Sequence, residues 1–106
     1  MTDMQKYEYE LTVVIETGLE YEYKHNFLDS ISSLVRGLGG AVVDYSYEYK
    51  ENYTLAYPVT SKKGKTMEVA DYAFYKILLP EEKVSLFSKI LEKSTMILRF
   101  LLVKDK

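Results

Sequence analysis

The chain has 106 residues, the length of one domain, and 47% of them are apolar, which is enough for one modest hydrophobic core. Its net charge of −2 gives no general attraction to nucleic acid, so any such contact needs local basic patches. Cysteine is absent, which excludes disulfides and thiolate metal sites. The apolar runs are too short to span a membrane, and the charged start MTDMQKYEYE is no secretory signal.

The first predicted element is a strand over residues 7–15, in which two kinds of side chain alternate. One face is apolar: Tyr7, Tyr9, Leu11, Val13 and Ile15. The other face is mostly polar: Glu8, Glu10, Thr12 and Val14. A period of two is the signal of a half-buried strand, and Thr17-Gly18 ends it.

The period then changes, and residues 19–38 are predicted to form a helix. Apolar residues follow helical spacing: Tyr23, Phe27, Ile31, Leu34, Val35 and Leu38. Charged residues lie off this stripe: Glu20, Glu22, Lys24, Asp29 and Arg36. His25 is expected to face solvent on this helix. Gly39-Gly40 is expected to end this helix.

A second strand is predicted over residues 41–59, because residues 41–49 alternate again and Leu55-Ala56-Tyr57-Pro58-Val59 is extended in character. Residues 50–52 interrupt the pattern, so we expect one long strand with a bulge or kink. Pro58 has no backbone N–H, which places this strand at an edge of the sheet, close to where the chain turns.

Residues 60–65, TSKKGK, are the only dense basic cluster and predict a flexible hairpin tip, followed by a strand over residues 66–79. Pro80 fits the first turn of a second helix. Its expected buried stripe is Val84, Phe87, Ile90 and Leu91. A last strand over residues 95–103 has two faces. Met96, Leu98, Phe100 and Leu102 form one, and Ile97, Arg99, Leu101 and Val103 form the other, which we assign to the open side of the sheet.

The order strand, helix, strand, strand, helix, strand predicts one α+β domain over residues 1–106. This is the ferredoxin-like βαββαβ arrangement, in which a four-stranded antiparallel sheet carries two helices on one face. The other face of the sheet is expected to stay open.

No catalytic constellation is visible. His25 is the only histidine and has no second histidine or cysteine for a metal set. The glycines of residues 37–40 follow a helix rather than a strand, so they are expected to cap it and not to bind phosphate. We therefore expect no enzyme, no cofactor, no metal and no small-molecule substrate.

Tyrosine and the basic residues carry the remaining signals. The 11 tyrosines suit base stacking or a partner interface, or the core-facing side of the first two strands. The strand signature of RNA-recognition sheets is absent. Lys62, Lys63 and Lys65 fit either phosphate contacts or a solubilising loop. Arg99, within an apolar run, indicates an interface, or an edge arginine whose tip lies in solvent.

Four segments, in order along the chain, resemble one family. They are Lys6-Tyr7-Glu8, Leu55-Ala56-Tyr57-Pro58-Val59, Pro80-Glu81-Glu82-Lys83-Val84 and Ile97-Leu98-Arg99-Phe100-Leu101-Leu102-Val103-Lys104. With them, residues 5–104 resemble the bacterial small-subunit ribosomal protein S-six family. The resemblance implies a structural protein that binds small-subunit rRNA together with a small ribosomal protein of the S-eighteen type during platform assembly. It implies a ribosome-associated location in the cytoplasm, or in an organelle.

The resemblance and the basic residues together give two expected sets. The RNA-binding set is Lys6, Lys50, Lys62, Lys63, Lys65, Arg99 and Lys104. The partner-protein set is Leu55, Tyr57, Pro58, Val59, Ile97 and Leu101. The family usually has Gly and Arg directly before the Leu-Ala-Tyr-Pro segment, where this chain has Glu51, Asn52 and Tyr53. We hypothesise that Lys50 and the hairpin lysines restore the missing charge.

Two other classes of function stay open. One is a ferredoxin-like interaction or oligomerisation module that acts without RNA and pairs through its open sheet or a strand edge. The other is a small enzyme that uses the sheet as the floor of a pocket. A stable homodimer would favour the first, and a deep pocket around His25 and carboxylates would favour the second.

Overall fold

The computed structural model describes residues 5–43 and 47–105. Its elements are β1 (Lys6–Glu16), α1 (Tyr21–Gly37), β2 (Ala41–Val42), β3 (Glu48–Thr60), β4 (Thr66–Pro80), the 3-10 turn η2 (Glu81–Lys83), α2 (Val84–Lys93) and β5 (Ile97–Lys104). The predicted order of elements is confirmed, except that the second strand is divided in two. Asp44, Tyr45 and Ser46, which the alternation assigned to that strand, lie outside the described residues.

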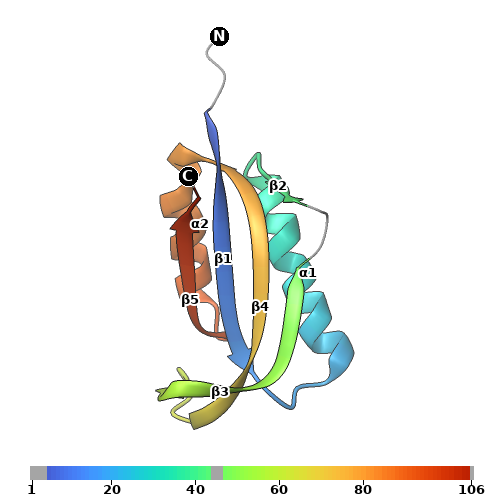
Figure 1. The fold of residues 1–106 in the computed structure, drawn as a ribbon, viewed down its shortest axis with the longest axis vertical. Helices are drawn as coiled ribbons and strands as arrows, with labels where there is room; N and C mark the ends of the chain where they lie inside the picture. Colours follow the sequence, from blue (N-terminus) through green and yellow to red (C-terminus); the bar gives the residue numbers. More distant parts are fainter. Residues whose placement is uncertain (1–4, 44–46, 106) are drawn as a thin grey trace.

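The strands form one antiparallel sheet in the order β2-β4-β1-β5, with β3 also pairing with β4. Both helices lie behind this sheet in Figure 1, and the opposite face of the sheet is turned toward the viewer. The predicted ferredoxin-like layers are therefore confirmed. In the described chain, no helix has the length and apolar character needed to cross a membrane.

The second strand is interrupted where the sequence showed unbroken alternation. β2 pairs with residues 77–78 of β4, the described residues Val43 and Tyr47 lie outside the strands, and β3 pairs with β4 from Glu48, opposite Phe74. The expectation of one continuous strand is wrong, because alternation on both sides of a gap looks the same as alternation along one strand.

β3 has a bulge at the predicted place. Lys50 pairs with Tyr72 and Tyr53 pairs with Ala70, so β3 contains one more residue than β4 over this interval. Asn52 is that site, with a left-handed φ of 54°. Its backbone N–H donates a 3.0 Å hydrogen bond to the Asp71 carboxylate. The interruption at residues 50–52 is thus a true β-bulge.

A second irregularity turns the end of β3 across the sheet. Thr54 pairs with Val69 and Val59 with Met67, so residues 55–58 lie outside the ladder. Pro58 therefore costs no ladder hydrogen bond there, and its predicted place on an edge strand near the turn is confirmed. We call residues 55–69 the hairpin arm. In Figure 1 it runs sideways below the ends of β1 and β5.

Two hydrophobic clusters lie on opposite faces of the sheet. The main core lies between the sheet and the helices, with Leu28, Tyr75 and Phe87 among its fully buried members. A smaller cluster lies on the other face and joins Val14, Ala70 and Leu55 of the hairpin arm. The face away from the helices is therefore open only up to the point where the arm packs on it.

The helical stripes need three corrections. Tyr23 is 56% exposed, whereas Lys24, which we placed off the stripe, is buried at 5% exposure. Ile90 is 38% exposed rather than buried. Helical spacing predicts the buried face of a helix only to within about one residue position. Lys24 is buried because its charge is paired in the interior, as described below.

The face assignment of Ile97 is also wrong. Val14 pairs with Arg99 while the next residue, Ile15, pairs with Ile97, so Leu98 is an extra residue in β5. Ile97 then lies in the main core at 4% exposure, and Leu98 packs in the smaller cluster. One inserted residue exchanges the faces of its neighbours, because side chains alternate with a period of two.

Candidate functional site on the open sheet face

One row of side chains crosses the open face of the sheet with a cation at each end. Lys50 pairs with Tyr72, Tyr72 with Val14, and Val14 with Arg99, so the row spans β3, β4, β1 and β5. We call these residues the cationic row. Neighbouring strands lie about 4.8 Å apart, so the backbones of Lys50 and Arg99 are separated by about 14 Å.

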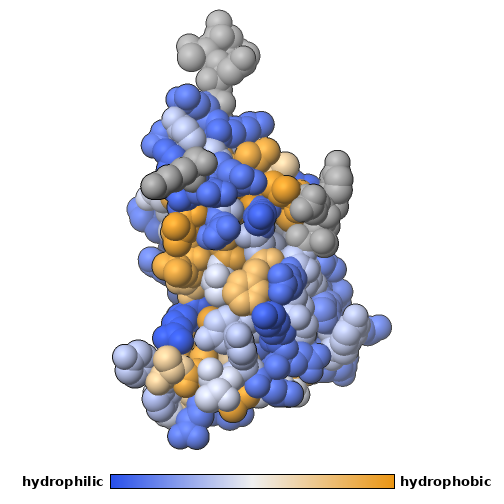
Figure 2. Space-filling view, in the orientation of Figure 1, coloured by the Kyte–Doolittle hydropathy of each residue, from blue (hydrophilic) through white to orange (hydrophobic). Residues whose placement is uncertain are grey.

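Arg99 borders a shallow depression of about 360 Å³. Its lining residues are Thr12, Val14, Tyr72, Arg99, Phe100 and Leu101. Leu101 beside it is 61% exposed, and Figure 2 shows apolar surface over this part of β5. An exposed apolar patch that contains an arginine is typical of interaction sites. The predicted placement of Arg99 and Leu101 on the open face agrees with this geometry.

An aromatic cluster lies next to the cationic row and was not predicted from the sequence. The rings of Tyr53 and Tyr72 meet edge to face at 5.0 Å, and Phe74 lies 5.9 Å from Tyr72. The Lys50 ammonium is 5.6 Å from the Tyr53 ring and 6.0 Å from Phe74. The alternation of β4 contained the signal, because Ala73 and Tyr75 face the core.

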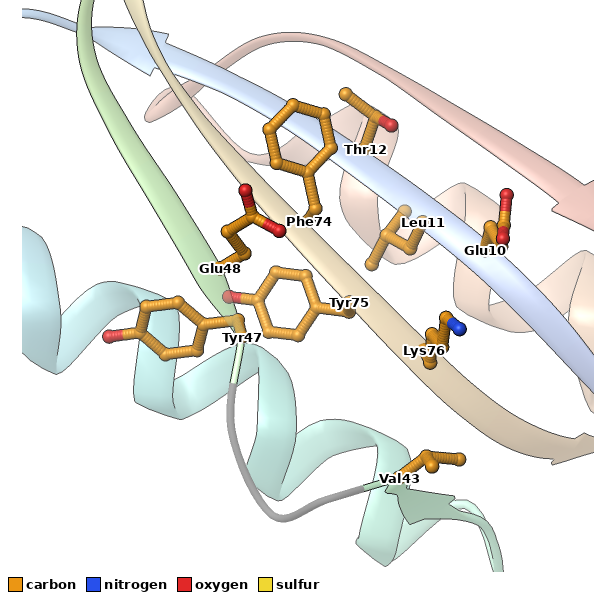
Figure 3. Close-up of a pocket in the computed structure, with 9 residues that line it drawn as sticks. All are labelled: Glu10, Leu11, Thr12, Val43, Tyr47, Glu48, Phe74, Tyr75 and Lys76. Carbon is orange, nitrogen blue, oxygen red and sulfur yellow. The ribbon is translucent and has the colours of Figure 1, made fainter.

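A second hollow, of about 450 Å³, lies beside the gap between β2 and β3 and is mixed in charge. Figure 3 shows Glu48, the first residue of β3, directed toward Phe74 of β4, and the Tyr47 ring beside the Tyr75 ring. Glu10 and Glu48 line it together with one lysine, Lys76. Carboxylates repel phosphate, so this half of the open face is less suited to nucleic acid than the cationic row.

The three hairpin lysines differ in their surroundings. Lys62 donates its ammonium hydrogens to the backbone carbonyls of Glu92 and Ser94, the latter at 2.8 Å, and so caps the end of α2. Lys65 lies 3.8 Å from the Glu16 carboxylate. Lys63 is exposed at the tip. Two of the three expected phosphate ligands therefore also make contacts within the chain.

The remaining cations of the predicted set lie at the other end of the sheet. Lys6 begins β1 and is exposed. The Lys104 ammonium is 3.6 Å from the centre of the Tyr7 ring, whose side chain packs on the helix-facing core. The molecule is 48 Å long, and its basic residues are spread along it rather than gathered in one patch. The structure brings together only Lys50 and Arg99, in one row.

The expected partner segment is divided by the bend of the hairpin arm. Tyr57 is 73% exposed, whereas Leu55 is 7% exposed and belongs to the smaller cluster. Pro58 is exposed and Val59 is partly buried. Tyr57 and Pro58 are thus accessible to a partner, while Leu55 holds the arm to the sheet and Ile97 lies in the main core.

Residues 8–104 match the family described as Ribosomal protein S6. The chain belongs to the ribosomal protein S6 family. The resemblance noted from four short segments is confirmed. This is a family of structural proteins, which agrees with the expectation that the chain is not an enzyme.

A solved structure supports the fold of this S6-family protein. The crystal structure of 30S ribosomal protein S6 from Thermotoga maritima superposes with a TM-score of 0.79 and covers 95% of this chain and 89% of that chain. The two sequences are only 15% identical, so this likeness shows the fold alone. No curated protein matches the chain.

A buried ionic cluster fixes the bulge of β3 in this S6-family chain. The Lys24 ammonium lies 3.0 Å from the Asp71 carboxylate, and Tyr49 donates a 2.5 Å hydrogen bond to the same oxygen. Asp71 is fully buried, and its other oxygen accepts the Asn52 N–H at 3.0 Å. Because Lys50 lies between Tyr49 and Asn52, this cluster also sets the position of one end of the cationic row.

His25 lies among tyrosines and does not face solvent as expected. Its Nδ1 is 2.8 Å from the Tyr47 hydroxyl, and its ring lies 4.2 Å from Tyr21 and 5.0 Å from Tyr49. The surroundings are aromatic, and the described part of the chain contains no group of three His, Cys, Asp or Glu residues that could hold a metal ion. These contacts join α1 to Tyr47 and to Tyr49 of β3.

Two of these tyrosines predict a loss of stability in alkali. Burial, with the nearby Asp29 charge, raises the pKa of Tyr47 to about 12, and burial with Asp71 raises the pKa of Tyr49 to about 12. A raised pKa in the folded state means that the stabilisation is present below pH 10 and is lost as the pH rises toward 12. We expect the urea midpoint to fall between about pH 9 and about pH 11.

The double variant Tyr47→Phe/Tyr49→Phe should show a smaller fall over the same range, and the fall that remains should come from Tyr75 and Tyr9, whose pKa values burial also raises. Tyr57→Phe is the matched control, because its ring is 73% exposed, and it should behave like the unmodified protein. Equal falls in all three proteins would show that Tyr47 and Tyr49 do not cause the alkaline sensitivity.

Proposed function

We propose that this protein is a structural component of the small ribosomal subunit. In this role it binds small-subunit rRNA together with a small ribosomal protein of the S-eighteen type during assembly of the platform, and it resides on the ribosome. Membership in the S6 family supports the assignment of the protein to the small ribosomal subunit. The observation that carries the rRNA contact is the cationic row on a sheet face that the helices leave open.

Phosphate contacts at the two ends of the row are the core of the proposal. Lys50 and Arg99 are both exposed, and they approach from opposite edges of the sheet. The Arg99 guanidinium offers paired donors that match phosphate oxygens, while Lys50 acts as a point charge. Such contacts position a protein on RNA without reading its sequence, and the shape of the RNA and a bound partner supply selectivity.

The partner protein is proposed to meet the accessible part of the hairpin arm and the apolar patch on β5. Tyr57 at 73% exposure and Leu101 at 61% exposure are the most exposed large apolar side chains on these two surfaces. Lys63 and Lys65 at the tip of the arm add positive charge. Lys63 is the hairpin lysine best placed to replace the basic groups missing before Leu55, since Lys62 holds the end of α2 and Lys65 lies beside the Glu16 carboxylate.

The test compares two double variants of equal charge in binding to a central-domain rRNA fragment, with the S-eighteen-type partner present. Lys50→Ala/Arg99→Ala should weaken binding by about tenfold or more. It should lower the slope of log affinity against log salt by about 1.8 if two phosphate contacts are lost. The control, Lys89→Ala/Lys93→Ala, removes two exposed charges from α2 on the other face.

Only a difference between the two variants supports the proposal. Equal weakening in both would mean that overall charge, and not the cationic row, governs the interaction. Unchanged binding in the Lys50→Ala/Arg99→Ala variant would remove the open sheet face from the rRNA contact altogether.

A further inference from the structure

The two edges of the sheet differ in how well they are protected against pairing with another strand. The β3 edge is interrupted by the bulge at Asn52 and by residues 55–58, which include Pro58. β5 lies at the opposite end of the strand order. From Arg99 to Lys104 it pairs with β1 in one regular register without a bulge or proline. An edge of this kind is open to strand addition.

The direction of the backbone groups on β5 follows from one hydrogen bond. The Asp105 N–H donates to the Glu8 carbonyl at 2.8 Å, so the backbone N–H and C=O groups of Asp105 are directed toward β1. The direction of the backbone N–H and C=O groups alternates from one residue to the next along an antiparallel strand. The backbone groups of residues 99, 101 and 103 are therefore also directed toward β1. Phe100, Leu102 and Lys104 therefore direct their N–H and C=O groups outward, away from the sheet.

We propose that the outer edge of β5 pairs with β5 of a second copy of this chain, antiparallel and about a twofold axis through Leu102. For the outward-facing N–H and C=O groups of the two strands to meet, the axis must pass through a residue of β5 and not between two residues. An axis through Phe100 or Leu101 would place the Leu98 bulge inside the new ladder, and an axis through Val103 or Lys104 would carry the ladder past the end of the strand. Leu102 is the centre that keeps the pairing inside β5.

Side chains in this register are complementary. On the open face, Leu101 lies opposite Val103 of the second copy, and the reverse contact repeats across the axis. These residues are 61% and 47% exposed in one chain, so pairing would cover an apolar strip. On the helix side, Phe100 lies opposite Lys104, which suits a cation–aromatic contact. Arg99 is aligned with Asp105, so like charges do not meet in the ladder.

The occupant is a second copy rather than an unrelated strand because one register satisfies both partners at once. A self-complementary patch is the requirement for a twofold interface. The interface is one strand wide, so the dimer is expected to be weak and concentration-dependent. This proposal does not rest on rRNA binding, and either can fail without the other.

Sedimentation equilibrium of the purified full chain tests the association. The average mass should rise from 12.4 kDa toward twice that value as the concentration increases from micromolar to millimolar. Leu101→Lys should raise the dissociation constant at least about tenfold, because the new charge faces an apolar partner. Leu86→Lys, at a 46% exposed position on α2, is the matched control and should leave the constant unchanged.

Disulfide trapping tests the register, because the chain has no cysteine of its own. Residues 101 and 103 would form a non-hydrogen-bonded pair with Cα atoms about 4.5 Å apart, within disulfide range. A mixture of the Leu101→Cys and Val103→Cys proteins should cross-link to mixed dimers on oxidation, and neither protein should do so alone. A monomer at every concentration, an unchanged constant in Leu101→Lys, or equal cross-linking in the single variants would overturn the proposal.

Discussion

Replacing Asp71 with alanine is expected to lower the free energy of unfolding by about 3–5 kcal/mol, as measured by urea denaturation followed by circular dichroism. The change leaves the Lys24 ammonium buried at 5% exposure without its partner. Tyr49 and the Asn52 N–H lose the same acceptor. The loss is a large share of the total stability of a small domain.

A double variant distinguishes the cost of an unpaired charge from the worth of the pair. Lys24→Met/Asp71→Leu removes both charges and keeps the volume apolar, so it should recover most of the stability that Asp71→Ala loses. If the double variant is as unstable as Asp71→Ala, the penalty does not arise from the unpaired Lys24 charge.

The same carboxylate should make the fold sensitive to acid. Burial by itself raises the pKa of Asp71, but hydrogen bonds from Tyr49, the Asn52 N–H and Lys24 outweigh it and hold the pKa below its ordinary value of 3.8. A lowered pKa means that the stabilisation is present above pH 3.8 and is lost as the pH falls through the folded-state value. Asp71→Ala should lack this part of the acid response.

Gly40→Ala is expected to lower the free energy of unfolding by about 3 kcal/mol, through overlap of the new methyl group with the backbone of β4. A Cβ at this position would collide with the Leu78 carbonyl oxygen and lie 3.1 Å from a Val35 methyl carbon. Gly40 also donates its N–H to the Val35 carbonyl at 2.9 Å, so it cannot move away freely. Thermal and urea unfolding measure the change.

Gly37→Ala is the matched control and should change stability in the opposite direction. A Cβ at Gly37, the last residue of α1, would have no neighbour within 4 Å. Alanine restricts the unfolded chain more than glycine does, so this variant should gain about 0.5–1 kcal/mol. If both variants shift stability by the same amount, contact with β4 is not what requires glycine at position 40.

Much of the fold was readable from the sequence, because local periodicity and turn chemistry carry that information. Alternation located β1 and β4, helical spacing located both helices, and Pro58 indicated an edge strand near a turn. The bulge before the Leu-Ala-Tyr-Pro segment was readable for the same reason, since residues 50–52 break the period in place. The family could also be recognised from the sequence, because four short segments occur in the order typical of its members.

The composition of the candidate site was readable only in part. Arg99 and Leu101 were placed correctly on the open face, whereas Ile97 was not, because the extra residue Leu98 follows from pairing with β1. Tyr72 and Phe74 were missed, although their alternation with buried neighbours was available. Lys62 was placed in the RNA-binding set, because nothing local shows that the hairpin reaches α2.

The sequence by itself therefore determined the elements, their order and the layered α+β fold of this protein. Tertiary structure decided which side chains share the open face, where β2 separates from β3, and that Lys24 is buried against a carboxylate 47 residues away. The physical reason is that helix and strand periods depend on neighbours along the chain. Register, bulges and ion pairs are instead selected by strands and helices that meet only after folding.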